Sequence, residues 1–319
     1  MPDLTIEKKS HIVNITCQGG LVELHVRNLG VTGKPVYGGG LRGIVKEFSR
    51  ASRRNMLKLM ASLERPKSGE IWVFLTLTYG EVYPAHREAK RHLDVFLKRL
   101  DRIAPGASGV WRYDLQERGA GHFHLLLFGL PFIPKSRVQQ MWAEVIGDYA
   151  QYCIDPRTGE AGRPFTRIEA ISHFKKAMSY VSKYAAAPAS HSGFNYDAYL
   201  TVDGNLIDPV TGENMGTPGR WWGVWHRSLL PMAVEKAASV SDVLAAFYDF
   251  RRSVRAYRQA TLRMRIKEKE RLGFETKGLK RSLKRVGHWA TGRDCGFFAF
   301  VEDADQWFEH FMDCVMAAD

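Results

Sequence analysis

The sequence predicts an α+β protein in which a central antiparallel sheet is flanked by helices. Its composition is that of a globular chain, with 45% hydrophobic and 25% charged residues among 319. Between residues 71 and 187, runs of β-forming residues alternate with segments of helical periodicity. Two of the strand-like runs follow each other across a turn containing Gly119 and Gly121, which indicates antiparallel pairing.

The N-terminal region predicts a hairpin followed by a basic helix. His11–Cys17 and Leu21–Val26 alternate between apolar and polar residues and are separated by Gln-Gly-Gly. After a glycine-rich loop, the apolar residues of Lys46–Arg65 recur at helical spacing. The basic face of this helix is either solvated or lies along a DNA backbone, and its candidate DNA contacts are Arg50, Arg53, Arg54 and Lys58.

The central region predicts strands that meet as hairpins and helices that cross between them, the arrangement of a ferredoxin-like sandwich. The expected order is strand, helix, strand, strand, helix, strand, helix. These segments are Ile71–Thr78, His86–Ile103, Val110–Gln116, His122–Leu130, Pro134–Tyr149, Phe165–Ile171 and Ser172–Ala187.

The C-terminal third predicts a basic, largely helical extension. Residues 188–218 are rich in Gly, Pro, Asn and Asp and predict an irregular insertion. A long helix is expected over Pro231–Leu272, and its arginine density from Phe247 onward favours a DNA contact. Thr276–Asp319 predicts a small strand and a helix. We therefore expect three regions: 1–69, a core of 70–231, and 232–319.

Composition and charge also limit the function classes. The net charge of +12 and the pI near 9.5 favour a polyanionic partner, most often nucleic acid, although solubility alone can require such charge. No run of 18 apolar residues occurs, and the N-terminus lacks the apolar core of a signal peptide. Four scattered cysteines without a CxxC motif predict reduced thiols in a cytoplasm. Because no GxxxxGK[ST] motif is present, we expect no NTP-driven step.

The segment Gly119–Gly129 carries the strongest chemical signal. His122 and His124 are two residues apart in a predicted strand, so both imidazoles project from one face. The alternate residues Phe123, Leu125 and Leu127 would anchor the strand in the core. Two imidazoles on one face suit a divalent cation, although a histidine pair can also simply hydrogen-bond.

The preceding strand offers a third metal ligand. Asp114 and Gln116 share one face of that strand, whereas Glu117 points to the other. A bulge in the turn would reverse which face meets the histidines. We favour the face of Asp114 and Gln116 and keep Glu117 as the alternative.

The predicted helix Ser172–Ala187 carries a candidate nucleophile. Tyr180 and Tyr184 are four residues apart and therefore lie on one helix face. A neighbouring ammonium, from Lys176 or Lys183, or a metal would favour the phenolate. Two tyrosines on a helix can also be ordinary core residues with hydrogen-bonded hydroxyls.

Taken together, the strand Phe74–Tyr79, the GHFHLLL segment and the SYVSKY segment resemble the three motifs of the HUH endonucleases. Within this superfamily, the chain more specifically resembles the two-tyrosine rolling-circle replication initiators of phages and small bacterial plasmids. The resemblance covers roughly residues 70 to 190. It departs from the family in having Asp114 where relatives often have Glu, and Gly121 where they often have Pro. Gln116 is a frequent family residue that could share or replace the role of Asp114.

The resemblance implies an enzyme with the HUH nuclease fold that nicks and rejoins single-stranded DNA at a replication origin. It implies Tyr180 and Tyr184 as nucleophiles, with Lys183 either steadying the phosphate or assisting protonation of the 3′ oxygen. Mg²⁺ or Mn²⁺ would be held by His122, His124 and Asp114 or Gln116, and Lys176 would join the DNA contacts. A host helicase and polymerase are the expected partners, in the cytoplasm of a bacterial host.

Two other functions remain as alternatives. The same fold serves transposases and conjugative relaxases, but single-tyrosine transposases lack a YxxxY pair and relaxases usually carry three histidines. A non-enzymatic module that binds RNA or single-stranded DNA through aromatic residues needs no paired histidines. An assay for metal-dependent nicking distinguishes such a binding module from the nuclease.

Overall fold

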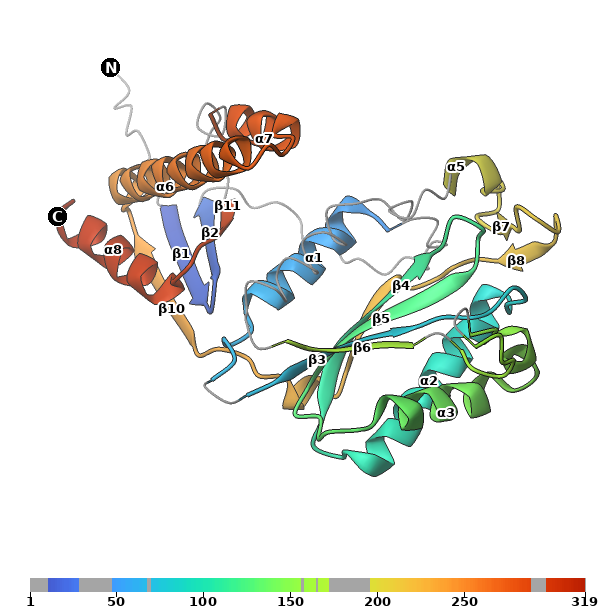
Figure 1. Cartoon of the computed structure of the whole chain (residues 1–319). Coiled ribbons are helices and arrows are strands. Elements are labelled where there is room, and N and C mark those ends of the chain that lie inside the picture. The colour runs from blue at the N-terminus through green and yellow to red at the C-terminus, as the bar shows by residue number, and fades with distance from the viewer. Residues whose placement is uncertain are drawn as a thin grey trace, which may run out of the picture. The chain divides into compact units, whose positions relative to one another are not determined.

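The computed structural model divides the chain into two compact units, residues 39–232 and residues 1–38 with 233–319 (Figure 1). It describes residues 11–28, 48–67, 70–155, 158–164, 166–171, 196–287 and 297–318. Both units combine helices with antiparallel sheets, so the α+β class is confirmed. No helix in these ranges is long and apolar enough to cross a membrane.

A five-stranded sheet forms the centre of unit 39–232. Its strands run in the order β6-β3-β5-β4-β9, and every neighbouring pair is antiparallel. Their bounds are β3 Trp72–Leu77, β4 Ser108–Leu115, β5 Gly121–Phe128, β6 Thr166–Ile171 and β9 Trp222–Trp225. The strands expected at residues 71–78, 110–116, 122–130 and 165–171 are thus confirmed within a few residues.

Helices α2 (His86–Ile103) and α3 (Lys135–Ile146) cover one face of this sheet (Figure 1). Trp142 of α3 is fully buried there, with its ring 5.8 Å from Phe96 of α2 and 6.4 Å from Phe123 of β5. Its indole N–H donates to the carbonyl of Thr78 at 2.7 Å. The expected inward face of β5, Phe123, Leu125 and Leu127, is buried as predicted.

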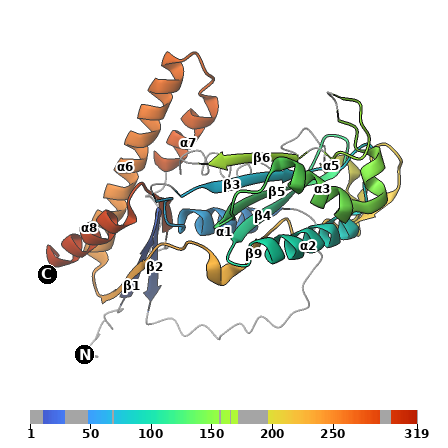
Figure 2. The ribbon, with the colours of Figure 1, turned by 60° about the horizontal axis from the view of Figure 1, so that its bottom comes forward.

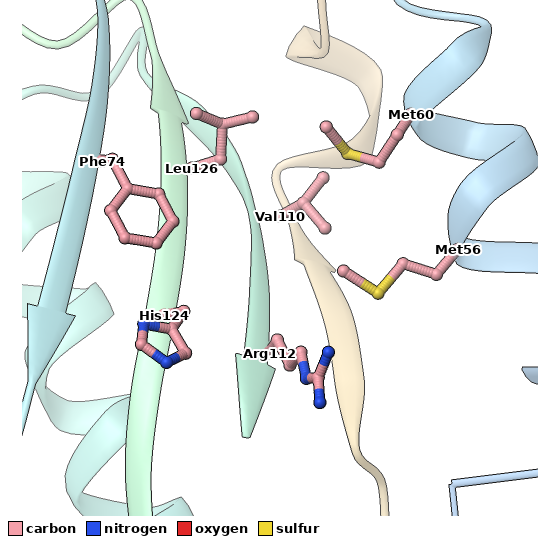
Figure 3. Close-up of a pocket in the computed structure, with 7 residues that line it drawn as sticks. All are labelled: Met56, Met60, Phe74, Val110, Arg112, His124 and Leu126. Carbon is pink, nitrogen blue, oxygen red and sulfur yellow. The ribbon is translucent and has the colours of Figure 1, made fainter. Parts of the chain in front are cut away.

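Helix α1 (Arg50–Ala61) lies on the opposite face of the sheet (Figure 1). Ser49 caps it by accepting a hydrogen bond from the Ser52 amide. Met56 and Met60 point from α1 onto the sheet beside Val110 (Figure 3). The Trp222 indole N–H donates to Ser52 Oγ at 2.9 Å, which ties α1 to strand β9.

The second unit is built on a four-stranded antiparallel sheet in the order β10-β1-β2-β11. Its strands are β1 His11–Gln18, β2 Leu21–Asn28, β10 Glu235–Ser241 and β11 Phe297–Phe300, so the N-terminal hairpin is confirmed. Helices α6 (Leu244–Arg271), α7 (Lys277–Gly287) and α8 (Ala304–Met316) complete it. Figure 2 shows α7 returning alongside the far end of α6.

This arrangement corrects two expectations for the C-terminal third. Residues 235–241 form a strand instead of the start of a helix over Pro231–Leu272, because they pair with β1 along their whole length. Thr276–Asp319 contains a helix, a strand and a second helix. The two units also divide the chain differently from the three expected regions, since the hairpin of 11–28 pairs with β10 and β11.

Three short elements lie in the expected irregular insertion, and part of it is outside the described residues. They are α5 (Tyr196–Tyr199), β7 (Leu206–Ile207) and β8 (Asn214–Gly216). The helix expected over Ser172–Ala187 lies outside the described residues. The 3-10 turns η1 (Gly147–Tyr152) and η2 (Arg227–Leu229) follow α3 and β9.

The packing of β5 against α3 predicts a large stability effect. Phe123→Ala should lower the free energy of unfolding by about 3–5 kcal/mol, because it leaves a cavity among rigid aromatic neighbours. Urea titration followed by tryptophan fluorescence measures this. Phe132→Ala is the control, since that ring is 92% exposed and its loss should change stability by less than about 0.5 kcal/mol. Equal effects of the two substitutions would contradict the assigned core.

Candidate metal centre

Strands β4 and β5 bring the candidate metal ligands together through their register. Asp114 pairs directly with His122, and Arg112 pairs with His124. Directly opposed residues of an antiparallel pair project to the same face. All four side chains therefore lie on the face of the sheet that α1 covers, while Phe123 and Leu125 point to the other face.

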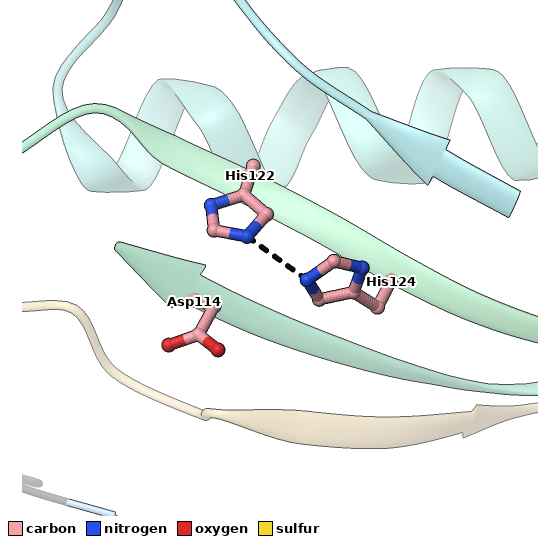
Figure 4. A group of neighbouring side chains, drawn as sticks. All are labelled: Asp114, His122 and His124. Atoms are coloured by element: carbon pink, nitrogen blue, oxygen red, sulfur yellow. Dashed lines mark hydrogen bonds between the residues drawn. The ribbon is translucent and has the colours of Figure 1, made fainter. Parts of the chain in front are cut away.

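The three metal-capable side chains converge tightly (Figure 4). One ligand-capable atom from each of Asp114, His122 and His124 lies within 4.8 Å of those of the other two. The Nε2 atoms of the two histidines are 2.9 Å apart. Asp114 is 2% exposed and each histidine 8% exposed, so the strands hold them with little freedom.

Neighbouring residues orient two of these side chains. His124 Nδ1 lies 3.1 Å from Thr76 Oγ1 on β3, a contact that fits an Nδ1–H donor and directs Nε2 towards His122. Arg112 Nη2 lies 3.0 Å from Asp114 Oδ2, and the Leu115 amide donates to Asp114 Oδ1. Both carboxylate oxygens are therefore fixed by the strand that carries them.

Burial controls the protonation of the site. Desolvation raises the pKa of Asp114 to about 6, although the adjacent Arg112 guanidinium acts in the opposite direction. Desolvation lowers the pKa of His122 to about 4, and the positive charges of Arg112 and Arg118 lower it further. At neutral pH the site therefore combines a carboxylate with a neutral imidazole, the protonation states that bind a metal.

The donor set fits a divalent cation. Two neighbouring ligands of an octahedral ion with bonds of about 2.1 Å lie about 3 Å apart, close to the observed separation of the two Nε2 atoms. Two imidazoles and one carboxylate leave further coordination positions for water or substrate oxygens. His122, His124 and Asp114 are thus the residues that would hold the ion.

Two other candidate ligands of the preceding strand have different surroundings. Gln116 Oε1 accepts two hydrogen bonds from Arg118, at 3.1 Å from Nε and 2.9 Å from Nη2. Arg118 also donates to the carbonyl of Tyr79 at 3.0 Å, while its own carbonyl accepts from the Tyr83 hydroxyl at 2.6 Å. The side chain of Glu117 is exposed and is absent from the convergent group.

Gly121 stands where proteins with the resembled motifs often have Pro, and the structure gives a local reason for glycine at this position. A Cβ atom at this position would lie 2.1 Å from the hydroxyl oxygen of Tyr113. That hydroxyl is 2.8 Å from His86 Nδ1, and Tyr113 is completely buried. The residue before His122 must therefore be glycine as long as Tyr113 occupies this space.

Helix α1 approaches the metal centre from the side. Figure 3 shows Met56 and Met60 of α1 facing a small pocket, with His124 and Arg112 at one end of it. Of the candidate DNA contacts, Arg50 and Arg54 are exposed, and Arg53 and Lys58 are half-buried. Tyr180, Tyr184, Lys183 and Lys176 lie outside the described residues.

Sequence reasoning missed Arg112 as part of the site. The guanidinium is 2% exposed, pairs with Asp114 and lies 5.2 Å from the ring centre of Phe48. Its position two residues before Asp114 on a predicted strand was the available signal, because it placed a charge on the same face. Arg118 was also missed, and nothing in its spacing indicated the contacts with Gln116 and Tyr79.

Comparison with known proteins gives one similarity. Residues 72–188 match the family model of the replication-associated protein ORF2/G2P, over less than half of the chain. No curated protein and no solved structure matches the chain. The matched region begins with β3 and contains the metal-capable cluster and the segment with Tyr180 and Tyr184. It supports a replication initiator of the Rep type.

We expect Asp114 to contribute more to metal binding than Gln116, because its carboxylate converges with both imidazoles. Asp114→Asn should weaken Mn²⁺ binding about tenfold or more, because it removes the only negative charge of the three convergent side chains. Gln116→Ala should change it less than about twofold, since that amide oxygen is held by Arg118. Isothermal titration of Mn²⁺ into the full chain measures both.

Glu117→Gln serves as the matched control, because it removes an exposed neighbouring carboxylate. Thermal unfolding by circular dichroism establishes that each variant is folded. An equal loss of Mn²⁺ affinity in Gln116→Ala and Asp114→Asn would contradict the assignment.

Proposed function

We propose that this protein initiates rolling-circle replication by nicking and rejoining single-stranded DNA at an origin. The observation that carries this proposal is the convergence of Asp114, His122 and His124 on paired strands inside the region similar to replication-associated proteins. A divalent cation bound there would polarise the scissile phosphate and stabilise the charge that develops in the transition state.

The reaction transfers a phosphoryl group without an external energy source. The phenol oxygen of Tyr180 or Tyr184 attacks the scissile phosphorus, and the bond from phosphorus to the 3′ oxygen breaks. The phenolic proton leaves, the 3′ oxygen takes up a proton, and the 5′ phosphate stays bound to tyrosine. Because a phosphodiester is exchanged for a phosphotyrosine ester, rejoining requires only the reverse attack.

Each group of the site has a distinct part in this proposal. Strands β4 and β5 hold the metal ligands rigidly, as their burial and hydrogen bonds indicate. Lys183 either steadies the phosphate or assists protonation of the 3′ oxygen. Two tyrosines allow repeated cleavage, since one can hold a 5′ end while the other attacks the regenerated origin.

The topology supports the expected ferredoxin-like nuclease fold. The elements β3-α2-β4-β5-α3-β6 follow the βαββαβ order, and both helices cover the sheet face opposite the metal centre. The histidine face is therefore left for α1 and a substrate. We propose that the DNA strand follows Arg50, Arg53, Arg54 and Lys58 of α1, with Lys176 near the tyrosines.

The partners of this reaction would be an origin single strand, a host helicase and a host polymerase. A non-enzymatic module that binds single-stranded nucleic acid is the contrasting function. The buried cluster favours the nuclease, because burying a carboxylate and two imidazoles together carries a desolvation cost that nucleic-acid binding alone does not require.

The proposal predicts a covalent protein–DNA adduct. Incubation with a labelled origin single strand and Mn²⁺ should give a band that survives denaturing electrophoresis. Tyr180→Phe/Tyr184→Phe should abolish it, because both nucleophilic oxygens are removed. An undiminished adduct in this double variant, or none with the unmodified protein on a replicon's own origin, would overturn the proposal.

Replacing both histidines by alanine separates chemistry from binding. His122→Ala/His124→Ala should lower cleavage by about 10³-fold or more, because the charge stabilisation is lost. Binding of the same strand in fluorescence anisotropy should change less than about threefold, since affinity rests on basic residues. Cleavage that persists in the absence of metal would contradict the assigned role of the site.

A further inference from the structure

Helices α6 and α7 form a hairpin that extends beyond the core of its unit. The buried residues that α6 contributes to this core end at Val254, although the helix continues to Arg271. Beyond that point α7 packs beside it, with Ile266 and Val286 buried (Figure 2). Most of the remaining surface of this hairpin is exposed.

The exposed surface of the hairpin is strongly basic. Its exposed basic residues are Arg263, Arg265, Lys267, Lys269, Arg271, Lys277, Lys280, Arg281, Lys284 and Arg285. Arg271 pairs with Glu268 and Lys280 pairs with Glu270. The other eight form no ion pair with a carboxylate in the described part of the chain. The surface therefore carries a large uncompensated positive charge.

This charge pattern costs folding stability. Like charges four residues apart on a helix destabilise it by about 0.2–0.5 kcal/mol per pair. Such pairs recur on both helices: Arg263/Lys267, Lys267/Arg271, Arg265/Lys269, Lys277/Arg281, Arg281/Arg285 and Lys280/Lys284. The first turn of α7 has no acidic residue and begins with Lys277, which the positive end of the helix dipole disfavours. A bound polyanion would offset these costs.

We infer that the α6–α7 hairpin is a second nucleic-acid site, which binds the phosphate backbone of duplex DNA. Single-strand sites rely on aromatic side chains that stack on bases. Between Arg263 and Arg285 the only aromatic residue is Phe274, at the tip of the hairpin. A surface that offers basic side chains but few stacking residues suits the phosphate backbone of a duplex, because the bases of a duplex are already paired with each other. The site takes duplex DNA, and it contains none of the groups of the metal centre.

Neutralisation of the hairpin tests this site in the full chain. A variant with R263Q, R265Q, K267Q and K269Q keeps good helix formers at exposed positions. The probe is a labelled 30-base-pair duplex in EDTA, measured by fluorescence anisotropy across a salt series. The affinity should fall at least about tenfold, and the slope of log K against log salt should decrease by about 2 to 4.

The control removes the same charge from another exposed helix face. R87Q, R91Q, K98Q and R102Q lie on α2, and together they should change the duplex affinity less than about twofold. The hairpin variant should be no less stable than the unmodified protein in thermal unfolding, because repulsion is relieved. The hairpin variant should also form the covalent adduct on a short single strand at the rate of the unmodified protein. The duplex-binding test is independent of nicking, because it is made in EDTA.

Three results would overturn the inference. The first is an equal loss of duplex affinity in the hairpin and α2 variants. The second is a loss of single-strand affinity in the hairpin variant as large as its loss of duplex affinity. The third is tighter binding of duplex RNA than of duplex DNA of the same length. A failure of adduct formation in the unmodified protein would affect the proposed nuclease and leave this site intact.

Discussion

The pairing register between β4 and β5 determines which polar side chains of this molecule converge. It sets Asp114 opposite His122 and Arg112 opposite His124, so four polar side chains meet on one face. A shift of one residue would turn all the side chains of one strand to the other face. The buried face formed by Phe123, Leu125 and Leu127 prevents such a shift, because it would expose apolar residues that α2 and α3 cover.

The same register places a buried cation beside the proposed metal ligands. Arg112 compensates the charge of Asp114 where both are almost completely excluded from water. Removing one partner of such a buried pair typically costs about 3–5 kcal/mol, because it leaves an isolated charge. The three convergent side chains are thus held in place by the packing of the domain.

Much of the architecture around the site follows from local sequence patterns. The helix His86–Ile103 has the predicted bounds because its apolar residues recur at helical spacing over eighteen positions. The hairpin of β4 and β5 follows from alternation and a glycine-containing turn, and the favoured face, that of Asp114, is the one that meets the histidines. The strand Glu235–Ser241 could not be predicted, because its small and polar residues form a strand only by pairing with β1, more than two hundred residues away.

The site itself was predictable only in part. Paired histidines two residues apart on a strand pointed to the cluster that could hold a metal ion, but the neighbours that orient its side chains come from contacts between strands. Gln116 satisfies the spacing of a ligand, yet its amide oxygen is held by Arg118 in the turn. Thr76 orients His124 from β3, 48 residues earlier in the chain. Such partners depend on tertiary structure, which spacing along one strand does not reveal.

The most direct test of the account is pulsed electron paramagnetic resonance of Mn²⁺ bound to the full chain. Two imidazole nitrogens should couple directly to the ion, and His122→Ala and His124→Ala should each remove one of them. A spectrum with no nitrogen coupling, or a coupling unchanged in both variants, would show that the paired histidines are not a metal centre.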